Sequence, residues 1–293
     1  MAVAAVGTSG PLIAATAAPA LVVAVWRNAL GAGAMAPYAI WRHRAELRAM
    51  RRPDWAAALG GGLALAAHFA TWMPSLTMTT VASATAFVAA QPVFAALIAL
   101  LRGEHVSRRA WLGIVIAVAG VAALSGADLY VSRRAFAGDL LALLGGALAA
   151  LYMSLGSKAR QTVSLAPYAV ICYSTAALAL GGIALAAHER MTGLSADSWV
   201  KILALTAGAQ LLGHTLFNRV LKTTSATVVS VCILLEVPSA AVIAALWLGQ
   251  VPSWTAVPGA LLILAGLAVL VTGAGTRGAG HSGEPLTGDV TGQ

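Results

Sequence analysis

Long apolar runs separated by short polar loops dominate this chain of 293 residues. A transmembrane helix needs about 20 mostly apolar residues, with a range of about 17–25. Because backbone groups find no water inside a bilayer, each run is expected to be a helix that pairs its own backbone. The sequence therefore predicts an all-α polytopic membrane protein with ten transmembrane helices, at residues 2–18, 20–41, 55–74, 79–101, 109–127, 138–157, 166–187, 199–221, 225–248 and 254–274.

Charged residues make up only 10% of the chain, whereas soluble proteins average about 25%. So few charges cannot cover a water-exposed surface, which excludes an ordinary soluble, disordered or disulfide-rich secreted protein. The two cysteines, Cys172 and Cys232, lie inside apolar runs and are expected to be free thiols that pack as small apolar groups. The N-terminus has no basic stretch ahead of its apolar run, so we predict no cleaved signal peptide.

The basic residues fall mainly in alternate loops. If the N-terminus is cytoplasmic and all ten runs cross the membrane, 13 of the 18 Lys and Arg residues lie in cytoplasmic loops and 4 lie outside. Such a split is typical of the positive-inside rule, and it places both termini on the cytoplasmic side of the cell membrane. The net charge of +8 then reflects membrane topology, and a nucleic-acid partner is not expected.

An internal repeat with a constant offset of 146 residues divides the chain into two halves. The matching pairs are His68 and His214, Pro92 and Pro238, Gly103-Glu104 and Gly249-Gln250, Ser107 and Ser253, Gly113 and Gly259, and Gly120 and Gly266. Each copy contains five spans, and an odd number forces the second copy to enter the membrane the opposite way up. The sequence therefore predicts two inverted five-helix repeats.

The predicted domains follow from this repeat: a first repeat at 1–127, an external linker at 128–137, a second repeat at 138–275 and a disordered cytoplasmic tail at 276–293. Two similar halves of opposite topology can exchange conformations, which opens a central site first to one side of the membrane and then to the other. Substrates of such proteins bind near the midplane, between the repeats.

The order and spacing of these motifs resemble the EamA-type permeases of the drug/metabolite transporter superfamily. The similarity covers about residues 8–272 and rests on Leu235-Glu236-Val237-Pro238, Leu248-Gly249-Gln250, Gly259 and Gly266, and on the first copy's Gln91-Pro92, Arg102-Gly103-Glu104, Gly113 and Gly120. The resemblance implies ten helices, cytoplasmic termini and transport of small metabolites. Gln250 departs from the pattern, because the family usually has an acid there.

Two charged residues inside the spans are candidate binding residues. Arg27 lies about 10 Å into the second span at 1.5 Å per residue, where a charge usually faces the bundle interior. Arg27 either contacts a substrate anion or takes part in gating, or it snorkels to the outer interface or forms a structural ion pair. Glu236 is the acid placed deepest in any span; it either carries a proton or a cationic group during transport, or pairs with Arg27.

Polar and aromatic residues complete the candidate substrate-binding set. His68 and His214 are repeat mates that either bind a polar ligand or form an interhelical hydrogen bond. Trp72 and Asn218 follow them at a spacing of four, on the same helix faces, although Trp72 also fits an interface-belt aromatic. Gln91 stands beside Pro92, where a bend would shape a cavity.

The sequence thus predicts a secondary transporter, preferably an exporter, of a small metabolite, amino acid or drug-like compound, with protons as the possible coupling ion. The alternative is an intramembrane serine protease that uses Ser9 within Gly7-Thr8-Ser9-Gly10. No metal or phosphate-loop motif occurs, so no cofactor is predicted. The expected partners are the substrate and the lipid bilayer, and the chain is compatible with a monomer or a homodimer.

Overall fold

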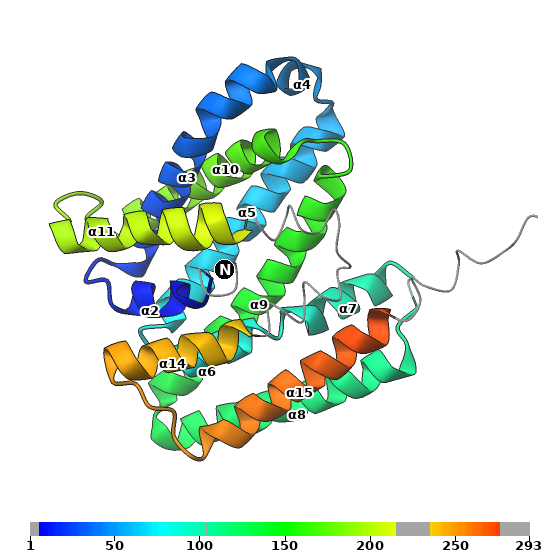
Figure 1. The fold of residues 1–293 in the computed structure, drawn as a ribbon, viewed down its shortest axis with the longest axis vertical. Helices are drawn as coiled ribbons and strands as arrows, with labels where there is room; N and C mark the ends of the chain where they lie inside the picture. The colour runs from blue at the N-terminus through cyan, green and yellow to red at the C-terminus, as the bar shows by residue number, and fades with distance from the viewer. Residues whose placement is uncertain (1–5, 104, 215–234, 276–293) are drawn as a thin grey trace, which may run out of the picture.

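The structure is a computed structural model that describes residues 6–103, 105–214 and 235–275, and all regular secondary structure within these ranges is helical (Figure 1). The first half contains α2 (Ser9–Ala14), α3 (Ala20–Arg42), α4 (Arg44–Ala49), α5 (Arg52–Ser75), α6 (Val81–Val88), α7 (Gln91–Leu101) and α8 (Arg108–Val131). The second half contains α9 (Arg133–Ala159), α10 (Leu165–Ala186), α11 (Ala196–Leu205), the π-helix η1 (Thr206–His214), α14 (Glu236–Leu248) and α15 (Ala256–Gly275). The predicted tail at 276–293 lies outside the described residues.

Within the described residues, five segments are long and apolar enough to cross a membrane: Ala20–Arg42, Arg52–Ser75, Val81–Leu101, Arg133–Ala159 and Leu165–Ala186. They coincide with predicted spans and differ from them by a few residues at their ends. Two shorter apolar helices, Glu236–Leu248 and Ala256–Thr272, lie in the ninth and tenth predicted spans. The all-helical membrane fold is therefore confirmed, while the count of ten spans stays a prediction.

The first predicted span is the least accurate. Its helix is interrupted at Thr8 and ends at Ala14, so residues 15–19 connect it to α3 without helical structure. Glycines at positions 7 and 10 favour such an interruption, because glycine loses more backbone entropy in a helix than other residues do. Pro19 then precedes α3 in the extended conformation that suits a helix start.

The predicted linker at 128–137 is almost entirely helical. Helix α8 continues to Val131 and α9 begins at Arg133, which leaves Ser132 alone between them. The Ser132 hydroxyl accepts a hydrogen bond of 3.0 Å from the Ala135 amide and so caps α9. A polar residue can thus cap a helix where the sequence predicts a linker.

The helix is interrupted where the bend at Pro92 is predicted, because α6 ends at Val88 and α7 begins at Gln91, with Pro92 in its first turn. Proline is favoured there, since the first turn leaves amide groups without partners in any case. Helix α14 begins in a similar way, at Glu236, with Pro238 in its first turn. Residues 215–234 lie outside the described ranges, so a bend in the second half stays a prediction.

Glycines hold α8 and α15 in backbone contact. A Cβ atom added at Gly113 would lie 2.6 Å from the Gly266 carbonyl oxygen, and one at Gly120 would lie 2.8 Å from that of Gly259. These contacts make α8 and α15 antiparallel, as Figure 1 also shows. Gly113 and Gly259 are repeat mates, as are Gly120 and Gly266, so exchanging the two repeats turns the first contact into the second. A twofold axis perpendicular to both helices produces this relation.

Contacts between other helices are also related by exchange of the two repeats. Helix α3 packs on α10, its repeat mate. Helix α5 packs on α9 and α10, while its counterpart in the second half, α11 with η1, packs on α2 and α3. The packing therefore fits two repeats of opposite orientation.

Candidate functional site

Arg27 lies in the interior of the bundle, where α3 faces α5 and η1. Its side chain is buried, with only 1% of the residue surface exposed. The Nε–H donates a 2.8 Å hydrogen bond to Gln210 Oε1, and the guanidinium carbon lies 4.6 Å above the centre of the Phe69 ring. A guanidinium over an aromatic face gains a cation–π attraction, which strengthens when water is excluded.

An amide pair extends this cluster. Gln210 Nε2 donates to Asn28 Oδ1 at 3.4 Å, and Asn28 Nδ2 donates to the Ala24 carbonyl oxygen at 2.8 Å. A Cβ atom at Gly31 would lie 2.8 Å from Gln210 Nε2, so the glycine gives the amide room to approach α3. Gln210 stands within a π-helix, a conformation that occurs frequently at functional sites.

Arg27 nevertheless has an unsatisfied donor. Its Nη1 atom is buried and has no hydrogen-bond partner among the described residues. The ion pairs found in the described ranges join His43 to Glu46, Arg51 to Asp54 and Lys201 to Asp197, and none of them joins Arg27 to Glu236, which is one interpretation of these two residues. The Glu236 charge still acts on Arg27 through space.

Three residues of α5 form a surface beside Arg27 that we call the aromatic ledge: His68, Phe69 and Trp72. The His68 ring stacks on Trp72 at 5.6 Å between centres and 11° between planes, and it meets Phe69 at 5.0 Å. His68 Nδ1 donates to the Gly145 carbonyl oxygen of α9 at 2.8 Å, which is the interhelical bond expected as the structural alternative. Trp72 is buried, and its Nε1–H has no partner in the described ranges.

The structure thus brings together Arg27, His68 and Trp72, with Glu236 within electrostatic reach. Gln91 is half-buried at the start of α7 and makes no contact with this group in the described interactions. His214 is the last residue of η1, and its side chain lies outside what the structure describes. Asn218 also lies outside the described residues.

Sequence reasoning missed Gln210, Phe69 and Tyr173. Gln210 lies four residues before His214 and therefore on the same helical side, and Phe69 is next to His68. Tyr173 is the repeat mate of Arg27 at the offset of 146, is buried, and interacts electrostatically with Arg27. These relations were available from the sequence, but the Arg27–Gln210 contact spans 183 residues, and only the packing reveals it.

Ser9 does not support the protease alternative. The residue is buried, with 3% of its surface exposed. Within the described part of the chain, its hydroxyl has no hydrogen bond to a histidine, and His68 uses its Nδ1–H on the Gly145 carbonyl oxygen. A serine nucleophile needs a base within hydrogen-bond reach.

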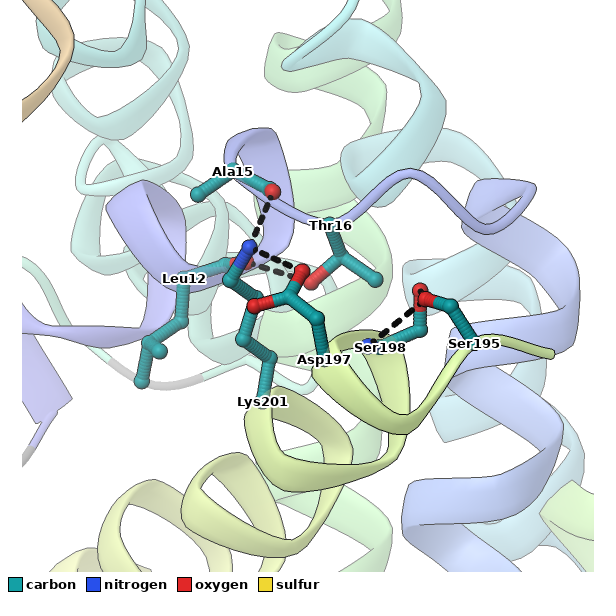
Figure 2. Close-up of polar contacts among 7 residues, drawn as sticks. All are labelled: Leu12, Ala15, Thr16, Ser195, Asp197, Ser198 and Lys201. Carbon is teal, nitrogen blue, oxygen red and sulfur yellow. Dashed lines mark hydrogen bonds and ion pairs between the residues drawn. The ribbon is translucent and has the colours of Figure 1, made fainter.

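One end of the bundle is joined by what we call the Lys201 clasp. Lys201 Nζ of α11 donates to the Ala15 carbonyl oxygen at 2.8 Å, just after α2, and to Asp197 Oδ2 at 2.6 Å (Figure 2). At the same end, Trp26 Nε1 donates to the Met191 carbonyl oxygen at 2.9 Å. A basic group and an indole therefore bind backbone carbonyls here.

At the opposite end of the bundle, an acidic side chain replaces the basic one in what we call the Glu46 clasp. The Glu46 carboxylate in α4 accepts hydrogen bonds from the Ser164 amide, at the start of α10, and from His43. Thr162 Oγ1 donates to Asp54 Oδ1 at 2.6 Å. Burial raises the pKa of Glu46, but the bonds from Ser164 and His43 outweigh burial and hold its pKa below the ordinary value.

Fold and site together define a multi-pass helical membrane protein with a buried cation and aromatic side chains between its helices. The pattern of the EamA-like transporter family matches residues 1–126 and 136–272, so the chain belongs to this family. Its members are membrane transporters of the drug/metabolite superfamily and not enzymes. The two matched segments divide the chain into two halves.

A solved structure described only as "Crystal structure of protein" is similar in fold. It shares 18% sequence identity with this chain at a TM-score of 0.65, and the similarity covers 92% of this chain and 94% of that one. At this identity the likeness concerns the fold alone. No curated protein matches this chain.

Proposed function

We propose that the protein is a secondary transporter that exports a small metabolite, amino acid or drug-like compound across the cytoplasmic membrane by alternating access. The observation that carries this proposal is the buried Arg27, which has an unused donor and lies beside the aromatic ledge. A charge at this depth is costly and usually marks a substrate pathway. Membership of a transporter family supports the same conclusion.

The two clasps support alternating access. They lie at opposite ends of the bundle, and each joins a helix of one half to a segment that borders a helix of the other half: Glu46 of α4 binds Ser164, and Lys201 of α11 binds Ala15. In an alternating mechanism the clasps would open in turn, so that the Arg27 region communicates with one side at a time. The positive-inside pattern assigns the Glu46 clasp to the cytoplasmic side and both termini with it.

Glu236 is the proposed proton carrier. It stands in the first turn of α14 beside Pro238, it is half-buried, and its charge acts on Arg27. A carboxyl group that faces a buried cation changes the local field when it gains or loses a proton, which couples protonation to substrate binding.

Export is tested by comparing the metabolites released by cells with and without the gene, followed by uptake of the identified compound into inside-out vesicles. Glu236→Gln should remove the response of transport to an imposed pH gradient. Glu189→Gln is a matched control, because Glu189 lies in the loop between α10 and α11. Transport that ignores the pH gradient, together with full activity of Glu236→Gln, would refute proton coupling.

A further inference from the structure

The positive charge of Arg27 is contacted, but not neutralised, by the described residues around it. Gln210 supplies an amide oxygen to Nε and Phe69 supplies an aromatic face, but no carboxylate of the described ranges forms an ion pair with the guanidinium. Buried charges in proteins are normally paired, because an unpaired one loses its hydration without compensation. The free Nη1 atom therefore indicates a place for a negatively charged partner.

The aromatic ledge limits the shape of that partner. His68 and Trp72 stack nearly parallel, and Phe69 continues the same surface toward Arg27. Flat rings of this kind favour contact with another flat, apolar group. The buried Trp72 Nε1–H is a donor without a described partner, so it fits a hydrogen-bond acceptor and not a second cation.

We propose that the transported compound is an organic oxyanion, such as a carboxylate, with a flat apolar body. Arg27 binds the oxyanion with its free Nη1, and the aromatic ledge receives the flat body. This inference rests on the proposed transport function and specifies the substrate class of the same site. An arginine suits the role because its fork of donors matches the two oxygens of a carboxylate.

Glu236 offers a competing explanation for the free donor of Arg27, and the two explanations predict opposite results. If Arg27 binds an oxyanion from the substrate, Glu236 is a like charge nearby, and Glu236→Gln should strengthen oxyanion binding severalfold. If instead Glu236 itself is the partner of Arg27 in another conformation, Glu236→Gln should destabilise the protein as Arg27→Gln does and should not improve binding.

The test uses the purified full-length protein in nanodiscs and four probes: benzoate, benzamide, benzylamine and acetate. The first three share a ring and carry negative, zero and positive charge, while acetate keeps the charge without the ring. Binding is followed by tryptophan fluorescence and by the shift in unfolding temperature. Benzoate should bind at least tenfold more tightly than each of the others.

Arg27→Lys, which keeps the charge and loses the fork, should weaken benzoate binding at least tenfold, whereas Arg134→Lys, at the exposed start of α9, should leave it unchanged. Trp72→Leu should reduce the preference for benzoate over acetate, and the exposed Trp111 provides the control Trp111→Leu. If benzamide or benzylamine equals benzoate, or if no probe binds, the inference is wrong.

Failure of this inference and failure of the transport proposal are distinguishable. Binding in nanodiscs requires no transport, so anion binding in a protein that moves nothing across vesicles would refute the transport proposal alone. Transport of uncharged or cationic compounds that Arg27→Lys leaves intact would refute the oxyanion inference alone.

Discussion

The contact between α8 and α15 predicts that Gly266→Ala destabilises the protein. The new Cβ atom would lie 2.3 Å from the Ala117 amide nitrogen and 2.7 Å from the Gly113 carbonyl oxygen, while ordinary contacts begin at 3.4 Å. Both atoms belong to the backbone, so no side chain can rotate away. The two helices must separate by about 1 Å, and overpacking of this kind costs about 1–3 kcal/mol.

The effect is measured as the unfolding temperature in nanodiscs, followed by the fluorescence of the 8 tryptophans. Each kcal/mol corresponds to roughly 2–4 °C for a chain of this order of size. Gly120→Ala should behave like Gly266→Ala, because its Cβ would lie 2.5 Å from the Ile263 amide nitrogen. The repeat relation requires this similarity.

Gly182→Ala in α10 is the matched control, since no heavy atom lies within 4 Å of its added Cβ. Alanine is the better helix former by about 1 kcal/mol, so this variant should be neutral or slightly more stable. Equal unfolding temperatures for Gly266→Ala and Gly182→Ala would show that α8 and α15 are not in backbone contact. That result would also contradict the twofold relation between the two repeats.

Three further predictions concern the ends of the bundle. The pKa of Glu46 is lowered in the folded protein, so its stabilising effect is present at neutral pH and is lost as the pH falls through that pKa. Glu46→Gln should therefore flatten the acid side of a plot of unfolding temperature against pH. Lys201→Met should cost about 1 kcal/mol of stability through the lost bond to the Ala15 carbonyl oxygen, while Lys158→Met, at an exposed position, should cost little. Equal losses would contradict the clasp. Gln250→Ala removes the acceptor that binds the Val81 amide at 3.0 Å and should lower the unfolding temperature, whereas Gln250→Glu keeps an acceptor and should not.

The membrane fold was largely predictable because lipid imposes a simple requirement on the sequence. The helix predicted at 20–41 is observed at Ala20–Arg42, and the one predicted at 166–187 at Leu165–Ala186. Apolar length alone determines such spans. Prediction from apolar length fails near the N-terminus, where glycines shorten α2, and at Ser132, where one polar residue both ends a helix and caps the next.

The candidate site was predictable only in part. A buried charge is visible in the sequence, so Arg27 was identified, and repeat matching identified His68. Its partners were not identified, because Gln210 and Phe69 reach Arg27 through helix packing that leaves no local pattern. An ion pair with Glu236, one interpretation of that residue, is not formed among the described residues, because similar depth in two spans does not fix the distance between their side chains.

The π-helix at Thr206–His214 has a consequence for how the site changes during a transport cycle. A π-helix closes its hydrogen bonds over five residues and not four, so it holds more residues per turn than the α-helix that precedes it. Conversion of this stretch to α-helical geometry would rotate Gln210 about the helix axis and withdraw its oxygen from Arg27, without any tilt of the helix. A local rewinding of one segment is thus a route by which the guanidinium could be released to a ligand while the ends of the bundle stay closed.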